Sequence, residues 1–220
     1  MDLEPLALSF GIAALATVLA ALVGVPLAAL LTRPFPGREL VDALVTAPMV
    51  LPPTVLGYYV LVAVGHDSAI GQAWEALTGS SLVFSFSGLV LAAFIAALPF
   101  VVKGARAALE DVDPRMLQAA RTLGASRRRA FVAVALPLAA RGIAAGLSLG
   151  FARALGDFGV TLMLSGNIAG STRTASLAIY DAVLGGRSAE AAGLIALTTA
   201  CAVGALVIAN RLVRRRLGRR

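Results

Sequence analysis

The sequence has few charged residues. Only 14% of its 220 residues are Asp, Glu, Lys or Arg, whereas 59% are hydrophobic and the mean hydropathy is +0.87. Soluble domains are usually about 25% charged and about 45–50% apolar. A chain of this length cannot bury so much apolar surface in one water-soluble core. This excludes a soluble enzyme, a secreted disulfide-rich domain and a disordered segment, and it leaves an integral membrane protein.

Groups that carry catalysis or bind metals are also scarce. One cysteine, Cys201, and one histidine, His66, cannot form an internal disulfide or a cysteine-based metal cluster. The single lysine, Lys103, does not belong to a GxxxxGK[ST] phosphate-binding loop. No Ser–His–Asp triad or pair of catalytic carboxylates is visible. We therefore expect no catalytic residue, no metal and no cofactor in this chain, which is not an enzyme by itself.

Long apolar runs are what the sequence has instead. A helix needs about 20 apolar residues to cross about 30 Å of hydrocarbon. Five runs meet or approach this length: 6–31, 41–64, 82–102, 138–164 and 191–210. We expect an all-α membrane helix bundle of about five transmembrane helices, forming one domain over residues 1–220. The polar region 165–190 predicts an external loop with a short helix near 174–184, and a half-inserted segment is the alternative.

The basic residues indicate how the spans are oriented. Fifteen of the 19 Lys and Arg residues lie in three segments: 32–40, 103–130 and 211–220. Residues 1–5 and 65–81 contain none. Because basic loops stay in the cytoplasm, the pattern predicts an N-terminus outside and a C-terminus inside the cell. The positive charge therefore indicates topology, and we expect no nucleic-acid partner.

The basic segment 103–130 contains signals for a short cytoplasmic helix. Asp113 followed by Pro114 predicts a helix start, Gly124 predicts its end, and Ser126 predicts the cap of a second helix. One stripe of the first helix is apolar: Met116, Ala120 and Leu123. Such a helix lies either on lipid headgroups or in a groove of a partner protein. Its small side chains slightly favour a partner protein.

The second predicted span contains three prolines. Pro48, Pro52 and Pro53 lie close to Thr54 and Gly57. Proline removes an amide donor and disrupts a helix, which membranes tolerate only against protein or a wet cavity. We expect this segment to line or gate a substrate path, and a packing kink is the alternative.

The fourth predicted span carries two opposite charges. Arg153 and Asp157 are four residues apart, so they share one helix face, and Phe158 follows them. Intramembrane charges are costly and usually face the bundle interior or a water path. The pair either sets the potential of an anion path or joins helices structurally, and the residues alone favour the structural interpretation.

Several stretches resemble a known family. Residues 118–124, QAARTLG, followed by Leu136 and Pro137, resemble the EAA loop of the membrane permease subunits of bacterial ABC importers, with Gln118 in place of the usual Glu. Three further stretches are similar to the molybdate permease branch: RPFPGR (33–38), LPPTVLGYY (51–59) and ARALGDFG (152–159).

The resemblance implies a set of partners and site residues. The partners are a second permease copy, two cytoplasmic ATPase subunits that hold ATP and Mg²⁺, an external oxyanion-binding protein and the cell membrane. The residues implied to couple to the ATPase are Asp113, Pro114, Met116, Leu117, Gln118, Ala119, Ala120, Leu123, Gly124 and Pro137, with Pro137 turning the chain into the fourth span. Those implied for the path or gate are Pro48, Pro52, Pro53, Thr54, Gly57, Arg153, Asp157 and Phe158.

The cargo implied by the resemblance is molybdate or tungstate. A sulfate or thiosulfate permease is the alternative within the same family. An anion channel or carrier that works without an ATPase is the alternative from another class, and the capped cytoplasmic helix would then have no partner.

Overall fold

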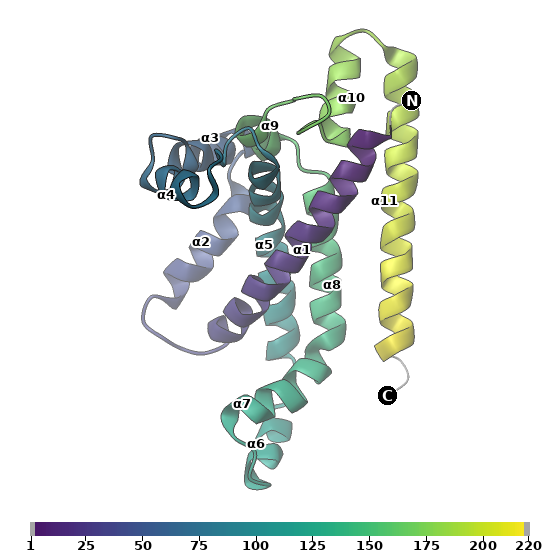
Figure 1. Cartoon of the computed structure of the whole chain (residues 1–220). Coiled ribbons are helices and arrows are strands. Elements are labelled where there is room, and N and C mark those ends of the chain that lie inside the picture. Colours follow the sequence, from purple (N-terminus) through teal and green to yellow (C-terminus); the bar gives the residue numbers. More distant parts are fainter. Residues whose placement is uncertain (1–2, 218–220) are drawn as a thin grey trace.

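The computed structural model describes residues 3–217, which form helices and connecting loops without any strand. The helices are α1 (Glu4–Leu31), α2 (Arg38–Val50), α3 (Pro53–Val64), α4 (Ala69–Thr78), α5 (Phe86–Glu110), α6 (Pro114–Thr122), α7 (Arg127–Ala130), the π-helix η1 (Phe131–Ala135), α8 (Leu136–Leu155), α9 (Gly159–Ser165), α10 (Ala175–Leu184) and α11 (Ser188–Leu217). The N-terminus, α3, α4, α9 and α10 lie at the upper end of the bundle, and α6 and α7 extend below the lower end (Figure 1). The expected basic tail lies partly outside the described residues, at 218–220.

Four helical stretches of the described chain are long and apolar enough to cross a membrane: Glu4–Leu31, Phe86–Glu110, Arg127–Leu155 and Ser188–Val207. They correspond to the first, third, fourth and fifth predicted spans. The short helix predicted near 174–184 is confirmed as α10, whose first turn is capped by Thr174. The chain is therefore all-α, as the apolar runs predict.

The second predicted span, 41–64, is not one helix. It is divided into α2 and α3 at Leu51 and Pro52, whose backbones are extended with ψ of 140° and 134°. Each of these two residues precedes a proline, a position that disfavours the helical conformation. Pro52 and Pro53 also lack the amide donors that would continue α2. The disruption that the three prolines predict in this span is therefore present, as a complete break between two helices.

The fourth predicted span also differs from its expected form. The helix begins at Arg127 and ends at Leu155, and α9 follows as a separate helix instead of extending the span to residue 164. The Asp157 carboxylate accepts a hydrogen bond from the backbone N–H of Thr161, 3.0 Å away. This bond satisfies a free amide in the first turn of α9 and so favours a new helix start.

The helix passes through Pro137 without a break. In the π-helix before it, the N–H of Leu136 donates to the carbonyl of Phe131, five residues back. A proline has no N–H, and in a regular α-helix its ring would clash with the carbonyl four residues before it. The wider π turn accommodates this proline. The helical path from Arg127 to Leu155 is therefore continuous, although α7 leaves the lower end of α8 at an angle (Figure 1).

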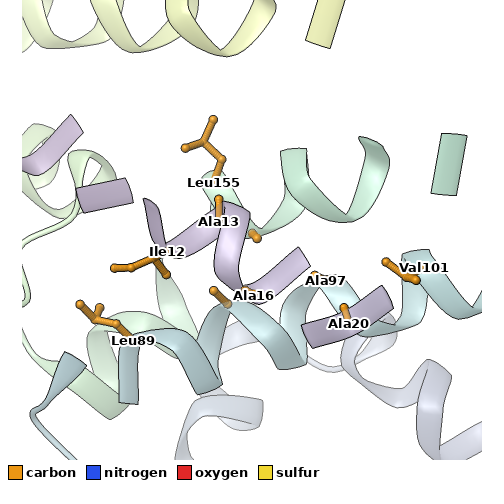
Figure 2. Close-up of a cluster of buried hydrophobic side chains, with 10 residues drawn as sticks. Ile12, Ala13, Ala16, Ala20, Leu89, Ala97, Val101 and Leu155 are labelled. Atoms are coloured by element: carbon orange, nitrogen blue, oxygen red, sulfur yellow. The ribbon is translucent and has the colours of Figure 1, made fainter. Parts of the chain in front are cut away.

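Helix α5 lies at the centre of the bundle and packs on α1 through small residues. Ile12, Ala13, Ala16 and Ala20 of α1 face α5 residues that include Ala97 (Figure 2). Alanine side chains let two helix backbones approach closely, which is how helices associate in lipid. This contact fixes α1 across the front of α5 (Figure 1).

Helices α5 and α8 approach even more closely, through glycines. Gly142, Gly146 and Gly150 recur every four residues on the α8 face that meets α5. A Cβ atom added to Gly146 would lie 3.0 Å from the Cα of Gly104, and one added to Gly104 would lie 2.6 Å from the Cα of Gly146. The two backbones therefore touch at this crossing, and no side chain fits between them.

Candidate functional site

The helix predicted below the membrane is confirmed as α6. Asp113 accepts a hydrogen bond from the backbone N–H of Arg115 at 2.8 Å, and Pro114 occupies the first helical position. After the helix, Gly124 has a φ of +87°, the left-handed conformation that glycine adopts at little cost. Ser126 accepts from the N–H of Arg129 at 3.3 Å and starts α7. Local capping residues therefore define both ends of this helix.

One face of α6 is anchored to the bundle and the other is open. Leu117 packs against the lower apolar cluster, which contains Val112, Ala135 and Leu109. The predicted apolar stripe points elsewhere: the exposed fraction of Met116 is 55% and that of Leu123 is 89%. Two neighbours, Gln118 and Ala119, are also exposed, and Ala120 is half-buried. An apolar stripe left open on a firmly held helix is typical of a docking surface.

The two segments predicted for the substrate path lie side by side at the upper end. A Cβ added to Gly57 of α3 would lie 2.8 Å from the Cβ of Met163 of α9, and one added to Gly159 would lie 2.6 Å from the Cβ of Pro53. Glycine is therefore required on both helices for this close contact. Segments about 100 residues apart in the sequence meet here (Figure 1).

The path residues differ in their exposure. Pro52, Pro53 and Thr54 are exposed at the break between α2 and α3, and Gly57 is buried against α9. Pro48 lies inside α2, where it is half-buried. The broken span therefore presents one polar hydroxyl and two proline rings on an open surface of the single chain.

The predicted pair of Arg153 and Asp157 is confirmed. Arg153 Nη1 lies 3.0 Å from Asp157 Oδ1, and the exposed fractions of the two side chains are 30% and 1%. Asp157 Oδ2 accepts from both the N–H and the hydroxyl of Thr161, at 3.0 and 2.7 Å. Phe158 packs on Tyr180 with ring centroids 5.0 Å apart. The carboxylate is thus buried and structurally engaged, whereas the guanidinium reaches the surface.

Replacing Asp157 with alanine is expected to destabilise the upper end of the bundle. The change leaves the N–H and hydroxyl of Thr161 and the charge of Arg153 without their acceptor, at a cost of about 3 kcal/mol. The measurement is the thermal unfolding temperature and the amount of folded protein in detergent. Asp157→Asn keeps an oxygen acceptor for Thr161 and should lose less. Equal stability of Asp157→Ala and the unmodified chain would contradict the structural role.

Sequence reasoning missed an ion cluster between α2 and α5 near the lower end. Lys103 Nζ lies 2.9 and 3.0 Å from the two carboxylate oxygens of Asp42, and Arg106 Nη1 lies 3.2 Å from Asp42 Oδ1. Arg106 Nε also donates to Glu110 at 2.8 Å, and Arg38 lies 3.7 Å from the same carboxylate. Helix α2 has no fully buried residue, so these charges supply much of its attachment to α5.

Replacing Asp42 with asparagine is expected to loosen α2. Because the cluster is partly exposed, the loss should be about 1 kcal/mol, which corresponds to an approximately fivefold greater open population. Hydrogen–deuterium exchange of residues 38–50 measures this change. Glu39→Gln removes one negative charge from an exposed position of the same helix and should leave the exchange unchanged. If exchange in Asp42→Asn stays at the level of the unmodified chain, the cluster does not hold α2.

Known proteins with similar sequences match nearly the whole chain. Residues 16–220 match the family described as "Binding-protein-dependent transport system inner membrane component". The chain is 42% identical over 218 residues to the molybdenum transport system permease protein ModB of Escherichia coli K12, covering 96% of this chain and 95% of that protein. It is 43% identical over 183 residues to ModB of Azotobacter vinelandii, covering 83% and 81% of the two chains.

More distant proteins share less of the sequence. The sulfate transport system permease protein CysT of Escherichia coli K12 is 37% identical over 158 residues, covering 71% of this chain and 57% of that protein. A chain of the MetNI methionine ABC transporter in an inward-facing conformation superimposes with a TM-score of 0.76 at 16% identity, covering 97% and 94% of the chains. That similarity concerns the fold alone.

Proposed function

Because this chain belongs to the family of binding-protein-dependent transport system inner membrane components, we propose that it is the permease subunit of an ATP-driven molybdate importer. It is a multi-pass protein of the cell membrane and not itself a catalytic enzyme. The observation that carries the cargo assignment is the 42% identity to a molybdenum permease over 96% of the chain. The sulfate permease is similar over a smaller part, which makes sulfate the second candidate.

The lower end of the bundle is the cytoplasmic side in this proposal, and α6 receives the ATPase. Helix α8 has 20 residues, enough to cross the hydrocarbon. Arg127 precedes it by nine residues, so the helix continues for about 13 Å along its axis before the segment that crosses the hydrocarbon. The headgroup layer on each side is only about 5–7 Å thick. A position this deep in the cytoplasm favours docking on a protein over lying on headgroups.

The ATPase subunits supply the ATP and Mg²⁺ sites. The open stripe of Met116, Ala120 and Leu123 fits an apolar groove on such a subunit. Leu117 and the continuous helix from Arg127 to Leu155 connect the docked α6 to the membrane region. A closing movement of the ATPases would thus be transmitted to the spans and alternate the access of the path.

The path itself requires a second copy of this chain. The candidate residues of α2, of α3 and of the break between them lie on one side of the bundle (Figure 1), and several of them are exposed in the single chain. Tyr58 and Tyr59 of α3 are exposed beside them. Pairing two copies across a two-fold axis would enclose Pro48, Pro52, Pro53, Thr54 and Gly57 together with the segment Arg153, Asp157 and Phe158. An external oxyanion-binding protein would deliver the cargo at the upper end.

Reconstitution tests this proposal directly. The permease, its ATPase and its external binding protein are placed in liposomes, and molybdate uptake is measured with ATP and with a non-hydrolysable analogue. Uptake should require hydrolysable ATP and should exceed sulfate uptake under the same conditions. Preferential sulfate uptake would support the sulfate alternative, and uptake without ATP or ATPase would overturn the importer assignment.

A further inference from the structure

An apolar groove lies between α1 and α5, beside the place where they cross. It has a volume of about 390 Å³, and its walls are almost entirely apolar. One wall comes from Leu15, Leu19 and Val23 of α1, and the other from Phe86, Val90 and Phe94 of α5. Trp74 of α4 also lines it. None of the residues assigned to the path or to the ATPase contact lines this groove.

The groove follows from how α1 and α5 pack. Their direct contact is made by small residues such as Ala16 and Ala97, which bring the helices together. The large side chains that form the groove walls therefore lie at the edge of this contact, and in each helix they recur at i, i+4 and i+8. This spacing forms a row along a helix axis. Each row is about 12 Å long, and the two rows form the walls of the groove.

We infer that this groove binds one acyl chain of a phospholipid from the outer leaflet. Both helices cross the membrane, so the groove opens onto hydrocarbon. It begins at Phe86, the first residue of α5, and ends eight residues further along that helix. Its length of about 12 Å matches most of one leaflet, which is about 15 Å thick. An extended acyl chain lying along the membrane normal has this shape.

A second protein helix fits the groove less well. The two copies in the proposed dimer meet through α2 and α3, which do not line the groove. This inference rests on the membrane location of the chain and on the orientation in the proposed function, and not on its cargo.

The chain carries its own reporter for the test, because Trp74 is its only tryptophan. A phosphatidylglycerol with brominated acyl chains is titrated into the detergent-purified full chain, and the quenching of Trp74 fluorescence is followed. A bound chain predicts quenching that saturates near one lipid per protein. Quenching that rises in proportion to the lipid fraction without saturation would mean bulk lipid only and would overturn the inference.

Two substitutions in the groove make the test specific. Ser87→Phe fills the groove, and the matched control Ser87→Ala removes the same hydroxyl without filling it. We expect Ser87→Phe to raise the lipid concentration for half-quenching at least tenfold, and Ser87→Ala to behave like the unmodified chain. Leu19→Asn, which makes one wall polar, should weaken binding in the same direction if Ser87→Phe fails to fold. Equal quenching in all variants would overturn the inference.

A second copy of the chain seated on the groove is the rival occupant. Leu19→Cys in a Cys201→Ser background places one thiol on the α1 wall. Disulfide-linked dimers formed in native membranes would show that protein covers the groove and would overturn lipid binding. None of these measurements involves ATP or molybdate, so their failure is distinguishable from failure of the proposed transport function.

Discussion

Replacing Gly146 with leucine is expected to prevent the chain from accumulating as a folded membrane protein. The Cβ alone would lie 3.0 Å from the Cα of Gly104 and 3.3 Å from the carbonyl oxygen of Phe100. Both obstacles are backbone atoms, so no rotamer change can relieve the overlap. Overpacking of a core usually costs about 1–3 kcal/mol. We expect at least the upper value here, because two long helices would have to separate.

The matched control is the same substitution at a helical glycine with free space. A Cβ added to Gly204 of α11 meets no atom within 4 Å. Gly204→Leu also adds the same side chain and the same helix propensity. The measurement is the amount of monodisperse protein extracted from membranes and its unfolding temperature. Normal yields of Gly146→Leu would show that α5 and α8 do not cross at these glycines.

Replacing Leu123 with aspartate should uncouple the permease from its ATPase without unfolding it. The side chain is 89% exposed in the single chain, so a charge there costs little folding free energy. In the assembly it would have to be desolvated inside an apolar groove. Loss of a central interface contact costs about 2 kcal/mol or more, which is about a 30-fold weaker complex. We expect ATPase co-purification and ATP-driven uptake to fall by at least that factor.

The control for this change is Arg121→Gln. It also lowers the net charge of α6 by one, but Arg121 lies outside the apolar stripe. Its uptake should stay within about twofold of the unmodified chain. If both variants lose the ATPase equally, charge and not the stripe governs docking. If Leu123→Asp still binds the ATPase normally, α6 is not the docking helix.

Local features of this fold could be predicted from the sequence. The ends of α6 follow from Asp113, Pro114 and Gly124, because capping depends only on neighbouring residues. The pair of Arg153 and Asp157 follows from their spacing of four residues, although α8 ends at Leu155 and Asp157 lies in the linker before α9. The roles assigned to these residues in coupling and in the path remain predictions.

Features that depend on distant contacts could not be predicted. Asp42 and Lys103 are 61 residues apart, and nothing in either segment identifies the other as its partner. The contact between α3 and α9 also needs the folded chain, although the glycines on both helices hinted at a close approach. The four-residue spacing of Gly142, Gly146 and Gly150 is a sequence signal for a close helix crossing, but it does not identify α5 as the partner.

The effect of each proline on a span depends on its surroundings. The prolines at 52 and 53 predict a disruption, and the structure has a complete break between α2 and α3 at this place. At Pro137 the wide π turn keeps the helix continuous. Whether a proline ends a helix thus depends on whether the preceding turn can widen, and sequence patterns do not report this.

The π-helix at Phe131–Ala135 also sets the direction in which the cytoplasmic helix faces. Removing one of its five residues would convert the wide turn into a regular one and would rotate everything before it by about 100° about the helix axis. The stripe of Met116 and Leu123 would then face a different direction around the axis of α8, even though every residue of the stripe is unchanged. One inserted residue therefore determines the angular register between α6 and the membrane spans.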